Sequence, residues 1–157
     1  MEKILVLGIG NYLMGDEGVG VHCIKDLKKN AYPDNVEIVD GGTGGFHLLS
    51  FFSGNKNIIM IDATLDSKTV GQVRVIEPKF ASDFPRALSS HDIGLRDLIE
   101  SAVITSGLPK IHLIVISISS VQNMQINLSP AIQKSIPLVI EKVNKIIKSI
   151  NGKAIED

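Results

Sequence analysis

Three acidic side chains stand at or just beyond the ends of three apolar segments, where a protein of this class could bind a cation. Glu17 follows the apolar segment 3–8 after a glycine-rich loop, Asp40 ends segment 36–40, and Asp62 ends segment 57–62. Parallel strands of an α/β sheet bring their carboxyl ends to one edge, where such proteins bind their ligands. Carboxylates gathered at that edge favour a cation over an anion.

A histidine could complete this set of ligands. His91 lies in the stretch SSHDIGL, in which Ser89 and Asp92 have the spacing of a capping box, so His91 is expected in the first turn of a helix or just before it. With Glu17 and Asp62 it would give two oxygens and one nitrogen, a mixture suited to nickel, zinc, iron or manganese. Three protein ligands leave coordination positions open, as in catalytic sites.

A purely structural explanation of the same residues stays open at this point. Asp16 and Glu17 could complement a helix dipole, Asp62 could accept a hydrogen bond from a loop amide, and His91 could be a surface turn residue. Spacing alone does not decide between the structural and the metal-binding explanation.

The glycine loop GIGNYLMGDEGVG, residues 8–20, also suggests a dinucleotide site, because a Gly-x-Gly pair follows an expected strand. Asp40 could then bind a ribose hydroxyl. However, Leu13 occupies the third glycine position, and Asp16 and Glu17 place negative charge where a pyrophosphate would meet the helix. The loop therefore favours a cation.

Hydrophobic periodicity indicates the elements that position these residues. Several apolar runs rich in Ile and Val are typical of strands covered on both faces, and one alternating run is typical of an antiparallel edge strand. Segments with helical spacing lie between them, and Ser129-Pro130 is a good helix start, after which Pro137 should kink or restart the helix. We expect a three-layer α/β/α sandwich, formed as a single domain over residues 1–157, with a mostly parallel twisted sheet. The apolar runs are 3–8, 36–40, 57–62 and 110–118, and the alternating run is 71–77.

Composition restricts the partners and the compartment. The chain has 16 basic and 17 acidic side chains and a net charge of -1, so we expect no nucleic-acid or anionic-membrane partner. No apolar run approaches the roughly 20 residues that span a bilayer. The one cysteine, Cys23, can form neither an internal disulfide nor a CxxC site, and it lies on an apolar helix face as a packing residue. These features predict a cytoplasmic location, and a monomer is the simplest expectation for the free protein.

Four blocks of the sequence, in order, resemble the motifs of the hydrogenase maturation endopeptidases. They are GIGNYLMGDEGVG, DGGTGG, IDA and SSHDIGL, within roughly residues 3–118. The resemblance implies an endopeptidase of the aspartic-peptidase-like kind that removes a C-terminal extension from the large-subunit precursor of a [NiFe] hydrogenase. It also implies that Glu17, Asp62 and His91 bind nickel, and that Asp40 is catalytic or orients the substrate.

The resemblance further implies that nickel arrives bound to the precursor, although zinc or another divalent ion could bind in vitro. A water polarised by the metal could attack the scissile amide, with Asp40 or a neighbouring carboxylate as base, or the metal could serve recognition only. Both mechanisms stay open. The alternative function is a non-catalytic nickel- or dinucleotide-binding module.

Overall fold

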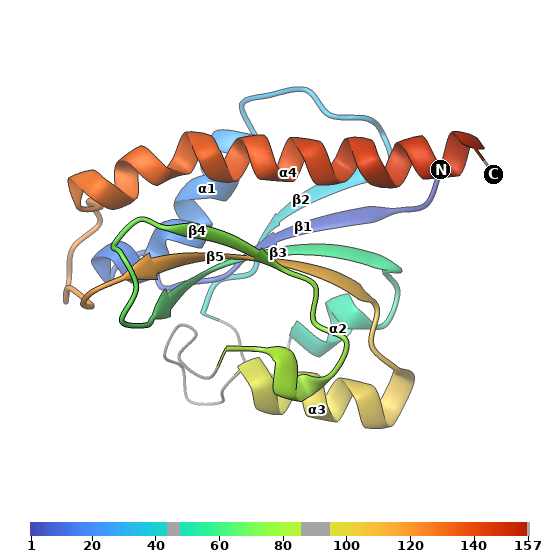
Figure 1. The fold of residues 1–157 in the computed structure, drawn as a ribbon, viewed down its shortest axis with the longest axis horizontal. Helices are drawn as coiled ribbons and strands as arrows, with labels where there is room; N and C mark the ends of the chain where they lie inside the picture. The colour runs from blue at the N-terminus through green and yellow to red at the C-terminus, as the bar shows by residue number, and fades with distance from the viewer. Residues whose placement is uncertain (44–47, 86–94, 157) are drawn as a thin grey trace.

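The computed structural model describes residues 1–43, 48–85 and 95–156, which form a five-stranded sheet with helices on both faces (Figure 1). The sheet order is β2-β1-β3-β5-β4. The first four strands in this order pair in parallel, and β4 pairs antiparallel with β5 at one edge. The expected fold class is therefore confirmed, including the antiparallel edge strand. The strands are β1 (Ile4–Gly8), β2 (Val36–Asp40), β3 (Asn57–Leu65), β4 (Val73–Ile76) and β5 (Lys110–Ile118).

Alternate residues of the strands supply two separate hydrophobic cores, one on each face of the sheet. Helices α1 (Val19–Leu27) and α4 (Pro130–Glu156) cover one face, where Cys23, Ile61 and Val139 are buried together. Helices α2 (Leu49–Phe52) and α3 (Leu95–Ser106) cover the other, where Met60 and Ile99 are buried together. Figure 1 shows the resulting three layers, with α1 and α4 above the sheet and α2 and α3 below it.

Two sequence expectations need correction. Strand β3 does not end at Asp62 but continues to Leu65, because β5 is equally long and pairs with it up to Ile118. Pro137 was expected to kink or restart the helix, and the restart is wrong because α4 runs unbroken through Pro137, whereas the kink stays a prediction. The apolar face of α4 packs in the core and holds the helix in place. Pro137 has no amide to donate to the carbonyl of Gln133, but both residues are exposed.

Across the residues that the structure describes, no helix combines the length and the hydropathy needed to cross a membrane.

Candidate functional site

The glycines of the loop after β1 bring segments of the chain itself close together. A Cβ added to Gly10 would lie 2.3 Å from the carbonyl oxygen of Glu17, and one added to Gly20 would lie 2.5 Å from that of Ile61. A Cβ on Gly18 would meet the Asn11 carbonyl oxygen at 2.8 Å. Such contacts admit only glycine. The loop's glycine spacing is explained by internal packing, which leaves no need for a bound pyrophosphate.

Asp16 has a structural task. Its Oδ1 accepts a hydrogen bond from the Ser129 amide at 2.8 Å, and its Oδ2 accepts one from the Ser129 hydroxyl at 2.9 Å. Ser129 immediately precedes α4, and the Asp16 amide donates to Gln122 Oε1 at 2.9 Å. Asp16 therefore fastens the 3₁₀ helix η1 (Gly15–Gly18) to the start of α4.

Glu17 is the neighbouring carboxylate of η1, and η1 packs against β3. Only 3% of its surface is exposed. Desolvation by burial raises the pKa of Glu17, because a charged carboxylate is less stable away from water. A cation bound beside Glu17 would relieve this cost, so the residue is suited to be a metal ligand.

Asp62 lies within β3 and directly follows Ile61. Ile61 is the register partner of Gly8, the last residue of β1. Its side chain is fully buried, and its Oδ1 accepts a hydrogen bond from the Ala63 amide at 2.8 Å. Met60 belongs to the core under α2 and α3, and alternation along the strand directs Asp62 to that same face. Asp62 and Glu17 are thus buried carboxylates on two elements in contact.

Asp40 is the last residue of β2 and is exposed. Its Oδ1 accepts a hydrogen bond from the Gly42 amide at 2.8 Å, which shapes the turn after the strand. Asp40 and Ile61 are both register partners of Gly8, so their side chains project from the same face of the sheet, the one covered by α1 and α4. Asp62 follows Ile61 along β3 and therefore projects from the opposite face. Their backbones are two strand spacings apart, about 10 Å. Asp40 is separate from the Glu17–Asp62 pair, as a base or a peptide-orienting residue can be.

His91, the expected nitrogen ligand, lies outside the described residues, four positions before α3 begins at Leu95. Within residues 1–43, 48–85 and 95–156, no three metal-ligating side chains converge. The structure places Glu17 and Asp62 on two elements in contact, and the assignment of Glu17, Asp62 and His91 as metal ligands stays a prediction.

Other reactive side chains have packing roles. Cys23 is fully buried, and burial raises its pKa to about 12, which removes it as a nucleophile at neutral pH. His22 of α1 is partly exposed: its Nε2 lies 3.0 Å from the Ile126 carbonyl oxygen, and its ring packs on Tyr12. His112 lies inside β5, with Nε2 3.1 Å from Glu77 Oε1, near the opposite edge of the sheet.

One arrangement was not found from the sequence. Arg74 of β4 pairs in register with Val115 of β5, and Asp62 of β3 pairs with the same residue. All three side chains therefore share one face, and Nη2 of Arg74 lies 2.7 Å from Oδ2 of Asp66. Only the strand order reveals this relationship, because Arg74 belongs to no motif block.

The structure is a mostly parallel α/β protein with two buried carboxylates near the carboxyl edge of its sheet, and comparisons with known proteins identify the family. The model of the hydrogenase maturation protease family matches residues 21–146. The hydrogenase 2 maturation protease of Escherichia coli K12 is 31% identical over 156 residues, covering 98% of this chain and 95% of that protein. The chain belongs to the hydrogenase maturation protease family and is a peptidase.

Further relatives agree. The HupD hydrogenase expression/formation protein of Bradyrhizobium diazoefficiens is 35% identical over 120 residues, covering 73% of this chain and 61% of that protein. The structure of the hydrogenase maturating endopeptidase HybD from E. coli superimposes with a TM-score of 0.83 at 30% identity, covering 94% of this chain and 93% of that one. The HycI maturation protease of Thermococcus kodakarensis shares the fold, with a TM-score of 0.75 at 23% identity, over 94% of this chain and 93% of that one.

Proposed function

We infer that this peptidase removes the C-terminal extension of a [NiFe] hydrogenase large-subunit precursor after nickel has been inserted. In this proposal the nickel is part of the substrate, and Glu17, Asp62 and His91 recognise it. The observation that carries the proposal is the burial of Glu17 and Asp62 on two elements in contact at the carboxyl edge of the sheet. Membership of the hydrogenase maturation protease family supports the choice of substrate.

The chemistry of the donor set fits nickel. Two carboxylates and an imidazole form a mixed oxygen and nitrogen set that accepts nickel or zinc, and three ligands leave room for the precursor's own ligands on the same ion. Burial raises the pKa of Glu17, so a cation delivered by the substrate would stabilise its charged form.

Asp40 has the exposure that a base or orienting residue needs. Its exposed carboxylate lies at the end of β2, followed by Gly41 and Gly42, and its Oδ1 holds the turn through the Gly42 amide. There it can accept a proton from a water that attacks the scissile amide, or a hydrogen bond from the substrate backbone. The nickel is then either the group that polarises this water or a recognition element only.

The decisive experiment follows the mass of the precursor. Protease stripped by a chelator and then freed of it is incubated with nickel-loaded and with nickel-free precursor, and the products are analysed by mass spectrometry. We expect a small loss at the C-terminus of the nickel-loaded precursor only. Cutting of nickel-free precursor would contradict recognition of substrate nickel, and absence of cutting in both samples would support the alternative of a non-catalytic binding module.

A further inference from the structure

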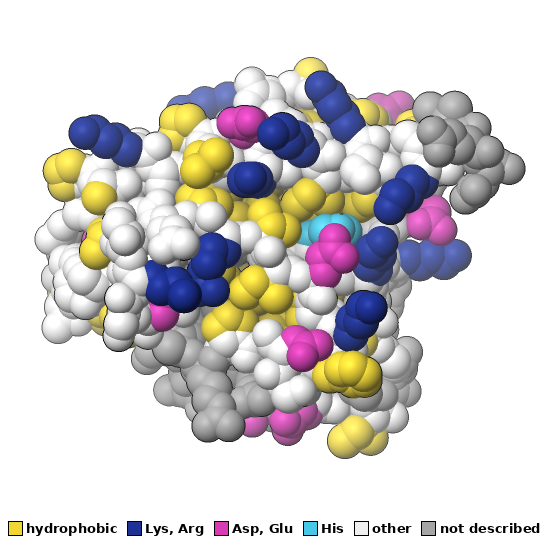
Figure 2. All heavy atoms as spheres, in the orientation of Figure 1, with side chains coloured by type: hydrophobic (Ala, Val, Ile, Leu, Met, Phe, Trp, Pro, Cys, Tyr) yellow, Lys and Arg dark blue, Asp and Glu magenta, His cyan; other side chains and the backbone are white. Residues whose placement is uncertain are grey.

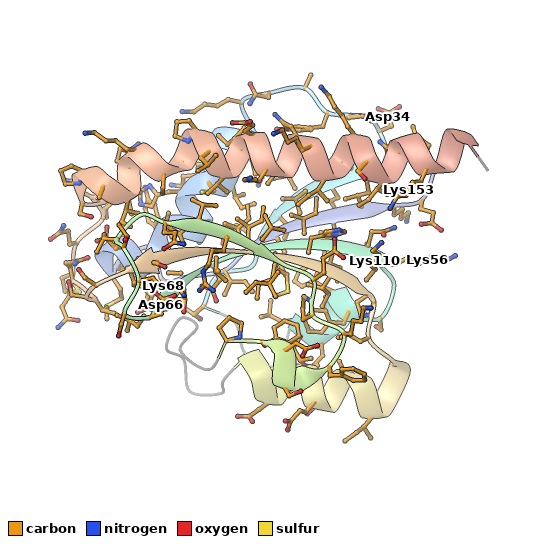
Figure 3. All side chains as sticks on the ribbon, in the orientation of Figure 1. Asp34, Lys56, Asp66, Lys68, Lys110 and Lys153 are labelled. Carbon is orange, nitrogen blue, oxygen red and sulfur yellow. The ribbon has the colours of Figure 1, made fainter. Side chains whose placement is uncertain are left out.

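Beyond the nickel ligands, one face of the sheet carries a second group of polar side chains near Asp62. Because register partners share a face, Asp62, Thr64, Arg74 and Ser117 all project from the α2 and α3 face, on strands β3, β4 and β5. The group lies at the carboxyl end of β3, where Figure 3 labels Asp66 and Lys68 at the start of the β3–β4 connection. Figure 2 shows basic side chains at this end of the molecule and also at the opposite end.

Arg74 is the cation of this group, and its donors are only partly used. Its Nη2 donates to Asp66 Oδ2 at 2.7 Å, while Nε is buried without a hydrogen-bond partner among the described residues. Its side chain is 28% exposed, so part of the guanidinium remains open to solvent. A guanidinium has five N–H donors in a rigid fork that matches carboxylate and carbonyl oxygens.

Ser117 supplies an independent observation. It is fully buried, and its Oγ has no hydrogen-bond partner in the described part of the chain. Ser117 lies directly opposite Thr64 on β3 and diagonally from Arg74 on β4. Buried polar groups without partners are rare in native proteins, and two on one face, beside a site residue, indicate a ligand that completes them.

We propose that Arg74, with Ser117 beside it, forms a subsite that binds an oxygen of the precursor chain next to the nickel site. This proposal rests on the proposed function, because the precursor is its ligand. Asp62 and Arg74 are two strand spacings apart, about 10 Å, and an extended peptide advances about 3.3 Å per residue. A chain crossing the sheet end from Asp62 therefore reaches Arg74 about three residues further on. The oxygen belongs to a backbone carbonyl or to a carboxylate of the precursor.

Steady-state cleavage of nickel-loaded precursor, together with equilibrium binding of a fluorescently labelled precursor, tests the subsite. Arg74→Gln should raise KM and weaken binding about tenfold while kcat stays within about twofold, since one charge-assisted hydrogen bond is lost. Arg74→Lys should recover part of the loss, because it keeps the charge without the fork. Lys68→Gln is the matched control, since it removes a nearby exposed charge, and it should leave KM unchanged.

Asp66→Asn separates substrate binding from a structural role of Arg74. If Arg74 binds the precursor, Asp66→Asn should leave KM unchanged or lower it, because the guanidinium is released from its internal partner. Equal changes in KM for Arg74→Gln and Asp66→Asn would overturn the proposal, as would an unchanged KM in Arg74→Gln. Thermal melts show whether each variant is folded. If Arg74→Gln does not fold, Arg74→Lys replaces it in the cleavage and binding measurements.

Two further comparisons complete the test. If added salt shrinks the difference between wild type and Arg74→Gln, the ligand oxygen is a carboxylate, and if the difference persists it is a carbonyl; either result supports the subsite. If the wild type binds but does not cut the precursor, the proposed function fails, but the equilibrium binding of labelled precursor still tests the role of Arg74. If the wild type neither cuts nor binds, both proposals are overturned.

Discussion

The carboxylate of Asp16 accepts hydrogen bonds from both the amide and the hydroxyl of Ser129, a residue 113 positions further along the chain. This contact joins the loop after β1 to the start of α4. It also separates two adjacent acidic residues, since Asp16 holds the fold together, whereas Glu17 is the one that we propose for the site.

Asp16→Ala should therefore destabilise the protein by roughly 2–3 kcal/mol, because it leaves the partly buried Ser129 amide without its acceptor. Ser129→Ala removes only the hydroxyl bond and should cost roughly 1 kcal/mol. Urea unfolding of the two single variants and the double variant measures both costs and their coupling. Additive losses would show that the two residues do not act as a pair.

Glu17→Gln should have the opposite effect on stability. The pKa of Glu17 is raised by burial, so its ionised form costs stability at neutral pH, and the cost disappears as the pH falls and the folded state takes up the proton. At pH 7 the variant should gain stability, while losing nickel-dependent cutting. Thermal melts at pH 7 and pH 4 check this, with a gain expected only at the higher pH. A less stable variant at pH 7 would mean that the charge is already compensated in the free protein.

Nickel binding should distinguish the acidic residues of the sheet edge. Asp62→Asn and His91→Ala should each weaken nickel affinity about tenfold or more, because each removes a ligand. Asp40→Asn should leave the affinity within about twofold and lower kcat, since Asp40 projects from the opposite face of the sheet to Asp62. Isothermal titration with nickel and cleavage kinetics supply the two readouts. A large loss of affinity in Asp40→Asn would place that residue among the ligands.

Cys23→Ala should lower stability by roughly 1 kcal/mol through a small cavity and leave cleavage intact. The thiol is fully buried and its pKa is about 12, so thiol reagents should modify it only in the unfolded protein. Mass spectrometry after treatment with iodoacetamide, with and without urea, is the measurement. Rapid labelling of the folded protein with loss of activity would contradict the packing role.

His112 should make stability depend on pH. Burial is the largest cause of its lowered pKa, and Lys110 and Lys153 act in the same direction, whereas Glu77 opposes them. A histidine with a lowered pKa contributes stability above its unfolded pKa of about 6.5, and this contribution is lost as the pH falls through the folded pKa. Wild-type stability should therefore fall between pH 7 and pH 5.

His112→Gln should flatten that fall, as measured by thermal melts across this pH range. His22 also has a lowered pKa, mainly through burial, so part of the slope should persist until it too is replaced. Identical slopes in the wild type and in His112→Gln would show that the histidine of β5 does not cause the effect.

The sequence predicts the strands well because four of them are rich in consecutive apolar residues and the fifth alternates as an edge strand does. It fails for the end of β3, since Asp62 and Thr64 interrupt the run although Ala63 and the following residues still pair with β5. The boundary depends on the length of a partner strand that lies far away in the sequence.

For the site residues too, local sequence predicts some features, and contacts between distant parts of the chain determine the others. Local motifs predict that Glu17, Asp40 and Asp62 reach one edge, because parallel strands end together. They cannot predict that Asp16 is engaged by Ser129, or that Arg74 shares a face with Asp62, because both depend on distant partners and strand order.

The bond between Asp16 and Ser129 also sets the order in which the enzyme becomes competent during its own synthesis. The ribosome makes the Glu17 loop early, but Ser129 follows only after 113 more residues, a delay of roughly ten seconds at about 5–20 residues per second. Until then the loop lacks its anchor, and β5, the partner of β3, is also incomplete. A nascent chain therefore carries Glu17 and Asp62 without the packing that positions them, and we expect peptidase activity to begin only when translation is nearly finished.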